Sequence, residues 1–402
     1  MVKIHPIEAL AVDPSRAVQI TCVPYDIVSR SESRALANGH PDTLLRVDRA
    51  DLEFPDPVKF NDPKVYIKAA KNFDRLIEIH ALLPESAPAI YLVRMVDGTH
   101  RQRGFAALAD FSDYASGQLR KHEFTRPDKE DDRVTLIRHL GALTGPVLAA
   151  YPDLPELTRQ MDEIESTKKP LAEVTDERGV IHTVWRCPNP AAIVTLFRQV
   201  ARSYIADGHH RAAAAARLAG EKPGPHGILT VYFPASELRI LPYHRLVLKL
   251  DPLTPESLLA AAKQSFTVTS SNGAPPDETG KIGLFLGGKW HQLAWKADPK
   301  SDPVARLDAS ALQDRLLGPS LQVKDPRTDP RLDFVGGIHG TKMLEEKVSS
   351  GQAAAAFSLP AVSMDQILAV ADADQIMPPK STWFEPKLRS GFYVHRFGPT
   401  RP

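Results

Sequence analysis

The hydrophobic pattern of the chain switches repeatedly between the spacing of helices and the spacing of strands. Apolar residues at helical spacing predict a helix over residues 65–80, and two apolar runs at 89–95 and 105–108, joined by a polar turn, predict a hairpin. Further helices are expected over 29–38, 154–172, 191–203 and 364–371, and further strands or hairpins over 17–23, 146–151, 175–186, 228–233 and 246–250. This alternation predicts an α/β (α+β) fold.

A chain of 402 residues suits two or three domains. After Asp251 a segment rich in turn-forming residues lies at 270–280, and later segments alternate short strands with helices. We therefore predict a first domain over residues 1–250 and a second, smaller α/β domain over 251–402. The 35 prolines are scattered, which indicates many turns and sharply ended elements.

Composition excludes several classes of protein. Fifty basic and 49 acidic side chains give a net charge of +1, so the counterion release that drives nucleic-acid binding is missing. Two cysteines, Cys22 and Cys187, cannot form a disulfide framework or a cysteine zinc site, and Cys22 is expected to be a buried apolar residue. No apolar run approaches the roughly 18 residues of a membrane span. The expected location is the cytoplasm.

The sharpest local pattern is Asp207-Gly208-His209-His210-Arg211, between a short apolar strand and an alanine-rich helix. The first turn of a helix offers unpaired N–H groups and the positive end of the helix dipole, which favours phosphate binding. Gly208 would permit close backbone approach, and Asp207 would cap the helix or hold a metal that bridges phosphates. The alternative is a plain N-cap with histidines facing solvent. Zinc is disfavoured, since adjacent helical side chains point roughly 100° apart.

The charged segment 121–133 holds a second candidate, the pair His122-Glu123. Thr125, followed three residues later by Asp128, predicts a capping box and places this pair in the loop before a helix. Loops often carry catalytic residues, so the pair suits a general acid or base. A solvated charged loop is the alternative.

A third candidate is the proline-rich segment 377–389. Lys380, Ser381 and Thr382 offer phosphate ligands there, while Trp383 and Phe384 offer stacking. Packing against the first domain is the alternative interpretation.

The chain resembles the domain-of-unknown-function 1015 (DUF1015) family over nearly its whole length. Five motifs carry the resemblance, in this order: Val23-Pro-Tyr-Asp26, His122-Glu123-Phe-Thr125 with Asp132-Arg133, Ala206-Asp-Gly-His-His-Arg211, Leu241-Pro-Tyr-His-Arg245 and Met377-Pro-Pro-Lys-Ser-Thr382. The segment Asp207 to Arg211 is also similar to that of ParB/sulfiredoxin-like proteins, in particular the archaeal kinase of free L-serine. The resemblance implies a ParB/sulfiredoxin-like core within residues 1–250, with an insertion between the second and third motifs, and a C-terminal domain whose end returns to the site.

Carried over residue by residue, the resemblance implies that Glu123 is the general base, with His122 beside it, and that Asp207 is a second or metal-linked carboxylate. The implied ligands of nucleotide phosphate are Gly208, His209, His210, Arg211, Lys380, Ser381 and Thr382. The implied substrate-binding residues are Tyr25, Asp26, Arg133, His244 and Arg245. The implied cofactors are ATP or ADP, together with Mg²⁺.

These residues predict a kinase that uses a nucleotide and Mg²⁺ to phosphorylate a small hydroxyl compound, foremost free L-serine. A nucleotide-binding regulatory module of the ParB type, and a non-catalytic partner of amino-acid-metabolising enzymes, remain as alternatives. The expected partners are a nucleotide and a small-molecule substrate; nucleic acid is unlikely, no membrane is expected, and a homodimer is left open.

Overall fold

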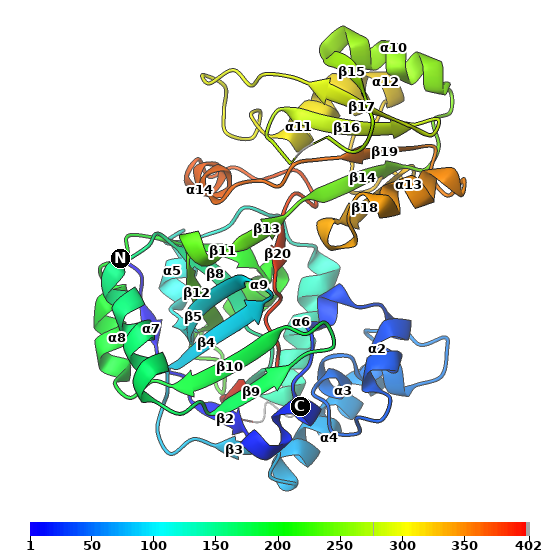
Figure 1. Cartoon of the computed structure of the whole chain (residues 1–402). Coiled ribbons are helices and arrows are strands. Elements are labelled where there is room, and N and C mark those ends of the chain that lie inside the picture. Colours follow the sequence, from blue (N-terminus) through cyan, green and yellow to red (C-terminus); the bar gives the residue numbers. More distant parts are fainter. Residues whose placement is uncertain (276, 399–402) are drawn as a thin grey trace. The chain divides into compact units, whose positions relative to one another are not determined.

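The computed structural model describes residues 1–275 and 277–398, and the chain divides into two compact units (Figure 1). Unit 1 contains Met1–Leu238 together with the described part of Pro386–Pro402, and unit 2 contains Arg239–Glu385. The predicted boundary near residue 250 lies inside unit 2. The chain therefore leaves unit 1 about two thirds of the way along and comes back to it near its end.

The main sheet of unit 1 has nine strands among the described residues and is mostly antiparallel. Its order is β6-β11-β8-β12-β5-β4-β10-β9, with β1 beside β5, and only β6/β11 and β8/β12 run parallel. The strands are β1 (Ile4–His5), β4 (Tyr91–Asp97), β5 (His100–Ala109), β6 (Leu119–Arg120), β8 (Val147–Tyr151), β9 (Ala172–Thr175), β10 (Ile181–Arg186), β11 (Ser203–Asp207) and β12 (Ile228–Pro234). Every residue of β8 and β12 is buried, as expected for strands covered on both faces.

A second sheet of unit 1 has the order β3-β2-β21-β7. Its strands are β2 (Ala9–Val12), β3 (Leu82–Pro84), β7 (Ala142–Leu143) and β21 (Tyr393–Arg396). The helices of the unit are α1 (Ala17–Ile20), α2 (Arg30–Ala37), α3 (Leu45–Asp48), α4 (Pro63–Glu78), α5 (Phe111–Ala115), α6 (Pro127–Leu140), α7 (Pro155–Thr167), α8 (Pro190–Phe197) and α9 (His209–Arg217). Phe197 at the end of α8 contacts Phe105, Tyr151 and Tyr232 of the main sheet, with ring centroids 5.2–6.3 Å apart.

Unit 2 has a six-stranded antiparallel sheet among its described residues, with the order β15-β17-β16-β19-β14-β18, and a two-stranded pair of β13 and β20. The strands are β13 (Arg239–Leu241), β14 (Tyr243–Val247), β15 (Thr267–Ser271), β16 (Lys281–Leu286), β17 (Lys289–Ala294), β18 (Leu332–Gly336), β19 (Ala355–Ser358) and β20 (Trp383–Glu385). The helices are α10 (Pro255–Ser265), α11 (Asp308–Leu312), α12 (Gly318–Leu321), α13 (Lys342–Ser349) and α14 (Met364–Asp372).

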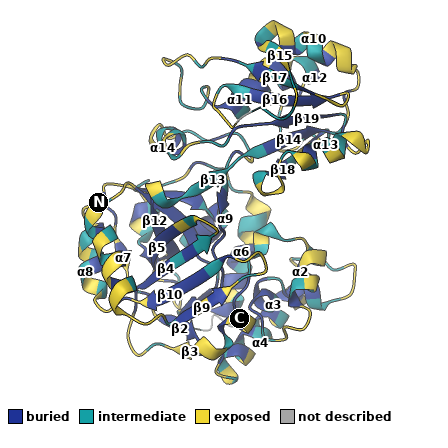
Figure 2. Cartoon of the chain, in the orientation of Figure 1, coloured by how far each residue is buried: buried dark blue, intermediate teal, exposed yellow. Residues whose placement is uncertain are grey.

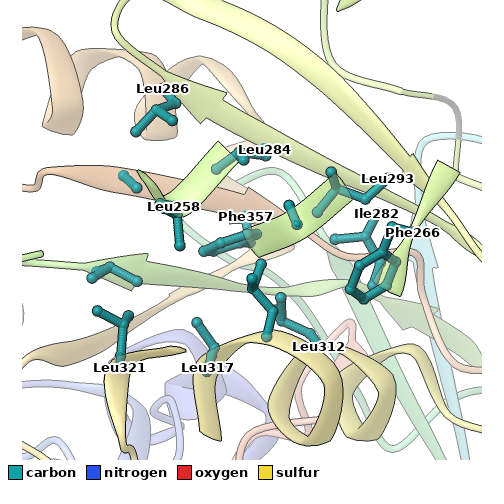
Figure 3. Close-up of a cluster of buried hydrophobic side chains, with 14 of the residues drawn as sticks. Leu258, Phe266, Ile282, Leu284, Leu286, Leu293, Leu312, Leu317, Leu321 and Phe357 are labelled. Carbon is teal, nitrogen blue, oxygen red and sulfur yellow. The ribbon is translucent and has the colours of Figure 1, made fainter. Parts of the chain in front are cut away.

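The larger apolar cluster of unit 2 lies on one face of this sheet, and a smaller one, which includes Leu246, Phe285 and Ala356, lies on the other. Figure 3 shows Leu284 and Phe357 of the sheet directed toward Leu312, Leu317 and Leu321 of the helical segment that packs on it. Figure 2 shows that most strands of both units are buried, whereas the helices expose one side. Each unit therefore has an apolar core of its own, which is the mark of a domain.

The structure confirms the mixed α/β class and corrects several predicted elements. Residues 17–23 are not a strand: Ala17–Ile20 form the short helix α1, and only Cys22 makes a β-bridge. The predicted capping box is also wrong, because α6 begins after Arg126 without a side-chain cap. The hydroxyl of Thr125 donates to Glu130 instead.

Other predicted elements are correct in type but not always in length. The helix predicted over 191–203 ends at Phe197, because Ser203 already belongs to β11. Part of the predicted turn-rich segment 270–280 belongs to β15, and its residue 276 lies outside the described residues. None of the helices in the described ranges combines the length and apolar character needed to cross a membrane.

Candidate active site at the start of α9

The turn between β11 and α9 positions the strongest motif of the sequence. Pairing of β11 with β8 shifts register between Ile205 and Asp207, and such an irregularity re-aims the side chain that follows it. Gly208 is the N-cap of α9 with φ 91°, a left-handed conformation that favours glycine. A Cβ atom at Gly208 would lie only 2.9 Å from Cζ of Arg211. The predicted strand–turn–helix arrangement is thus present, but Gly208 and not Asp207 occupies the N-cap.

The loop that carries His122 and Glu123 lies against this turn. The rings of His122 and His209 meet edge to face with centroids 4.6 Å apart, and Nδ1 of His209 is 3.7 Å from Oε2 of Glu123. Nε2 of His210 accepts a hydrogen bond of 3.0 Å from the backbone N–H of Arg126. Because α6 packs against α9, the two motifs are held together although they are far apart in the sequence.

Asp207 sits between two cations. Its Oδ2 accepts a hydrogen bond of 2.9 Å from Nη2 of Arg211, and its Oδ1 lies 3.3 Å from Nζ of Lys387. Burial raises the pKa of Asp207, but the charges of Lys387 and Arg211 outweigh burial and hold the pKa well below its usual range. Nη2 of Arg211 also lies 3.6 Å from Oδ2 of Asp26. Asp207 therefore stays ionised and is a weak proton acceptor.

The histidines of the site are neutral at physiological pH. Burial lowers the pKa of His122 to about 4. Burial, with a smaller contribution from His122, lowers the pKa of His209 well below its usual value, and burial also lowers that of His210. The alternative interpretation, in which the histidines face solvent, does not hold for His209, which is buried. Within the described chain, Nε2 of His209 has no hydrogen-bond partner.

Tyr25 and Arg133, two of the predicted substrate-binding residues, stack on each other beside this turn. The guanidinium of Arg133 lies 4.0 Å from the ring centroid of Tyr25, and its Nε donates to Asp132 at 2.7 Å. Tyr25, Arg133 and Arg211 line a cavity of about 30 Å³, together with buried Asp48. That volume holds a water molecule and not a substrate.

The remaining predicted residues belong to unit 2, and most of their side chains make contacts there. The guanidinium of Arg245 donates to the backbone oxygens of Tyr243, Pro379 and Lys380, at 2.8–2.9 Å. Ser381 donates to the oxygen of Pro378, and Nδ1 of His244 accepts from the N–H of Leu359. Nζ of Lys380 lies 5.6 Å from the ring centroid of Tyr243, and Thr382 adjoins these residues, half-buried. All of these contacts lie within unit 2.

Mg²⁺ does not fit Asp207 as a protein-held ion. Both carboxylate oxygens face cations, and the described residues contain no group of three His, Cys, Asp or Glu side chains able to hold a metal. A Mg²⁺ ion at this turn would therefore take its ligands mainly from nucleotide phosphates and water.

Sequence reasoning missed Lys387 and Arg389, which return to unit 1 with the last segment of the chain. Both side chains are buried. The only signal was their place in the singled-out segment 377–389, in which the motif drew attention to Lys380 instead. Neither hydrophobic pattern nor spacing distinguishes one lysine of that segment from another.

The site is thus an ion-paired strand–turn–helix in an α/β protein. The family described as "Protein of unknown function (DUF1015)" matches residues 4–310 of the chain. The chain belongs to this family, as its motifs indicated. No curated protein matches it.

Several solved structures are similar to the chain at low identity. A conserved hypothetical protein from Pyrococcus furiosus is 13% identical with a TM-score of 0.35, covering 68% of this chain and 92% of that one. A free serine kinase in complex with AMP is 12% identical with a TM-score of 0.36, covering 66% and 83%. SbnI with a C-terminal truncation, from Staphylococcus aureus, is 11% identical with a TM-score of 0.39, covering 70% and 84%. At these scores we take no residue role from them.

Proposed function

We propose that this protein transfers a phosphoryl group from ADP or ATP to a small hydroxyl compound, with free L-serine as the first acceptor to test. The observation that carries the proposal is that Glu123 and the Asp207–Arg211 turn come together at the start of one helix, with Nδ1 of His209 3.7 Å from Glu123. The choice of serine comes from the motif resemblance.

The start of α9 suits the phosphates of the donor. No side chain caps the helix at Gly208, so its first N–H groups and its dipole are directed at the turn. Nε2 of buried His209 lacks a partner within the described residues and would donate to or accept from a ligand. A neutral imidazole can do so without adding a charge that changes near pH 7.

The two carboxylates of the site, Glu123 and Asp207, differ in exposure and in ion pairing, so they suit different roles. Glu123 has 44% of its side chain exposed and lies at the mouth of the turn, where an acceptor hydroxyl could reach it. Asp207 is 28% exposed and is fixed by Arg211 and Lys387, which lower its pKa. We therefore propose that Glu123 removes the proton of the acceptor hydroxyl and that Asp207 orients the neighbouring cations.

The proposed step is an in-line displacement at phosphorus. Glu123 takes the proton of the acceptor hydroxyl as its oxygen forms a bond to the terminal phosphorus. The bond between that phosphorus and the bridging oxygen breaks, and the electron pair leaves with the shortened nucleotide. The charge on the transferred group is balanced by cations of the turn and by the helix terminus. Mg²⁺, when bound to the nucleotide, would supply further charge neutralisation.

The acceptor would lie on the side of the turn that carries Asp26. This carboxylate is 33% exposed, so it could bind the ammonium group of an amino acid. Tyr25 and Arg133 are stacked behind it and would fix its loop. His244, Arg245 and Lys380 to Thr382 remain sequence predictions, since their contacts lie within unit 2.

The test is to incubate the protein with ADP or ATP, Mg²⁺ and a panel of hydroxyl amino acids, and to look for a phosphorylated product by ³¹P NMR and mass spectrometry. We expect O-phosphoserine together with a stoichiometric amount of AMP or ADP. Tight nucleotide binding without a product for any acceptor would favour the regulatory module. The absence of nucleotide binding would overturn both.

A further inference from the structure

The last segment of the chain brings a second cation to Asp207. After Glu385 the chain re-enters unit 1, where Cys22 and Ser390 exchange backbone hydrogen bonds of 3.1 and 2.9 Å. Nη2 of Arg389 donates to the backbone oxygen of Thr21 at 2.7 Å. These anchors follow Lys387 at once, so its backbone position is fixed relative to the start of the chain.

The ammonium group of Lys387 is in an unusual place for a lysine. Its side chain is only 9% exposed, and a lysine is rarely buried unless it is paired. Its contact with Oδ1 of Asp207, 3.3 Å, is longer than the roughly 2.7–2.9 Å of a strong N⁺–H···O⁻ hydrogen bond. The neighbouring oxygen of Asp207 already has Arg211 at 2.9 Å. The contact of Lys387 with Asp207 is therefore the longer of the two cation contacts to this carboxylate.

Lys387 is the second cation beside Asp207. Arg211 faces two carboxylates, Asp207 at 2.9 Å and Asp26 at 3.6 Å. Lys387 adds the second positive charge, while buried His209 is neutral. Without Lys387, a phosphate arriving at α9 would meet an unbalanced carboxylate.

Arg211 is less able than Lys387 to turn toward a ligand. Its Nη1 donates to the backbone oxygen of Pro146, its Nη2 to Asp207, and its Cζ lies directly against Gly208. Lys387 instead carries three rotatable donors on a flexible four-carbon stem. An ammonium group on such a stem is better suited than this fixed guanidinium to change its partner.

We propose that Lys387 is the cation that contacts the terminal phosphate of the nucleotide. Before the nucleotide binds, Asp207 holds the ammonium group in place, and the terminal phosphate takes over that contact on binding. During transfer the same charge offsets the charge on the equatorial oxygens of the moving phosphoryl group. This inference rests on the proposed function, because it assumes that a nucleotide binds at the start of α9.

The first experiment compares ADP and AMP binding to the wild-type protein, Lys387→Met and Lys387→Arg by isothermal titration calorimetry without Mg²⁺. We expect Lys387→Met to weaken ADP binding by about 10- to 100-fold, the usual effect of a lost hydrogen bond to a charged group. AMP binding should change much less, and Lys387→Arg should recover part of the ADP affinity. The matched control is Lys68→Met, which removes a lysine paired with Glu53 at 2.9 Å elsewhere in unit 1.

The second experiment separates direct contact from simple neutralisation of Asp207. If Lys387 only balances that carboxylate, the double variant Lys387→Met/Asp207→Asn regains ADP affinity; if Lys387 contacts the phosphate, the double variant stays weak. Regained affinity, or equal ADP binding by the wild type and Lys387→Met, overturns the inference alone. A wild type that binds no ADP or ATP overturns the proposed function as well. Should Lys387→Met not fold, Lys387→Gln takes its place in both comparisons.

Discussion

Two buried arginines, one in each unit, have opposite surroundings. Arg211 in unit 1 is flanked by the carboxylates of Asp207 and Asp26, and although burial acts to lower its pKa, these negative charges leave it raised. Arg245 in unit 2 is surrounded by backbone oxygens and lies 4.7 Å from the ring centroid of Phe334. Burial lowers its pKa to about 9, with only a smaller opposing effect from Tyr243.

The difference separates a site that can exchange ions from one that cannot. In the proposed function, the charged side chains around Arg211 and Asp207 exchange an ion-pair partner for the ligand. An incoming anion then meets charges that are already organised. The carbonyls around Arg245 have no such exchange, and removal of the guanidinium would leave them unpaired. Both arginines lie in motifs of the family, yet the first set suggests chemistry and the second suggests stability.

The largest expected effect is on turnover when the base is removed. Glu123→Gln should lower kcat by about 10²- to 10⁴-fold, the usual contribution of a general base, while leaving ADP affinity nearly unchanged. Initial rates of O-phosphoserine formation and calorimetric ADP titration measure the two quantities. Glu163→Gln, the same change on the exposed face of α7, is the matched control. Full turnover by Glu123→Gln would show that Glu123 is not the base.

The next effect concerns the stability of unit 2. Arg245→Met should lower the free energy of unfolding by about 1–3 kcal/mol, because it leaves partly buried carbonyl oxygens without this donor. ADP affinity should stay the same. Urea denaturation followed by tryptophan fluorescence gives the first quantity. Unchanged stability with a raised KM for the acceptor would instead support the sequence prediction that Arg245 binds substrate.

A smaller effect follows from the pKa of His122. Since burial lowers this pKa from 6.5 to about 4, the unfolded chain binds a proton at pH 5 that the folded protein does not. The contribution to stability is complete above pH 6.5 and falls as the pH drops toward 4, by about 2 kcal/mol at pH 5. Comparing urea unfolding at pH 7 and pH 5 with that of His122→Asn isolates this contribution. Equal pH slopes for both proteins would show that His122 is not buried in its neutral form.

The smallest effect should have opposite signs for the nucleotide and for the acceptor. Asp26→Asn removes one of the two carboxylates near Arg211, so nucleotide affinity should rise by about 2- to 5-fold, in the range of a partly exposed ion pair. If Asp26 binds the ammonium group of the acceptor, KM for serine should rise in the same variant. Calorimetry and steady-state kinetics measure the two. A loss of nucleotide affinity would contradict the balance of charges around Arg211.

The sequence predicted the local structure of the main motif better than its surroundings. Gly208 before an alanine-rich helix correctly indicated a strand–turn–helix, because left-handed turns and helix starts are properties of short segments. The helical spacing of residues 65–80 likewise predicted α4. The apolar segment 17–23 was misread as a strand, since its pattern fits both states and its helix is short.

The partners of Asp207 could not be predicted, because they depend on contacts that no local pattern encodes. Lys387 reaches Asp207 only after the chain has passed through all of unit 2. The resemblance implied that the end of the chain returns to the site, but a boundary placed near residue 250 assumes continuous domains and therefore could not assign the segment from Pro386 to unit 1. For the same reason the sequence pointed to Lys380 as a phosphate ligand, whereas the contact of its ammonium group lies within unit 2.

The discontinuity of unit 1 also sets the order in which the protein can be completed during synthesis. Strand β21 lies between β2 and β7 in the small sheet, so both of these early strands lack a neighbour until residues 393–396 have been made. Unit 2 is continuous in sequence and can fold as soon as it leaves the ribosome, whereas unit 1 must wait for the last segment. Because Lys387 arrives with that same segment, a chain whose synthesis stops within unit 2 would lack both the closing strand and the second cation of the site.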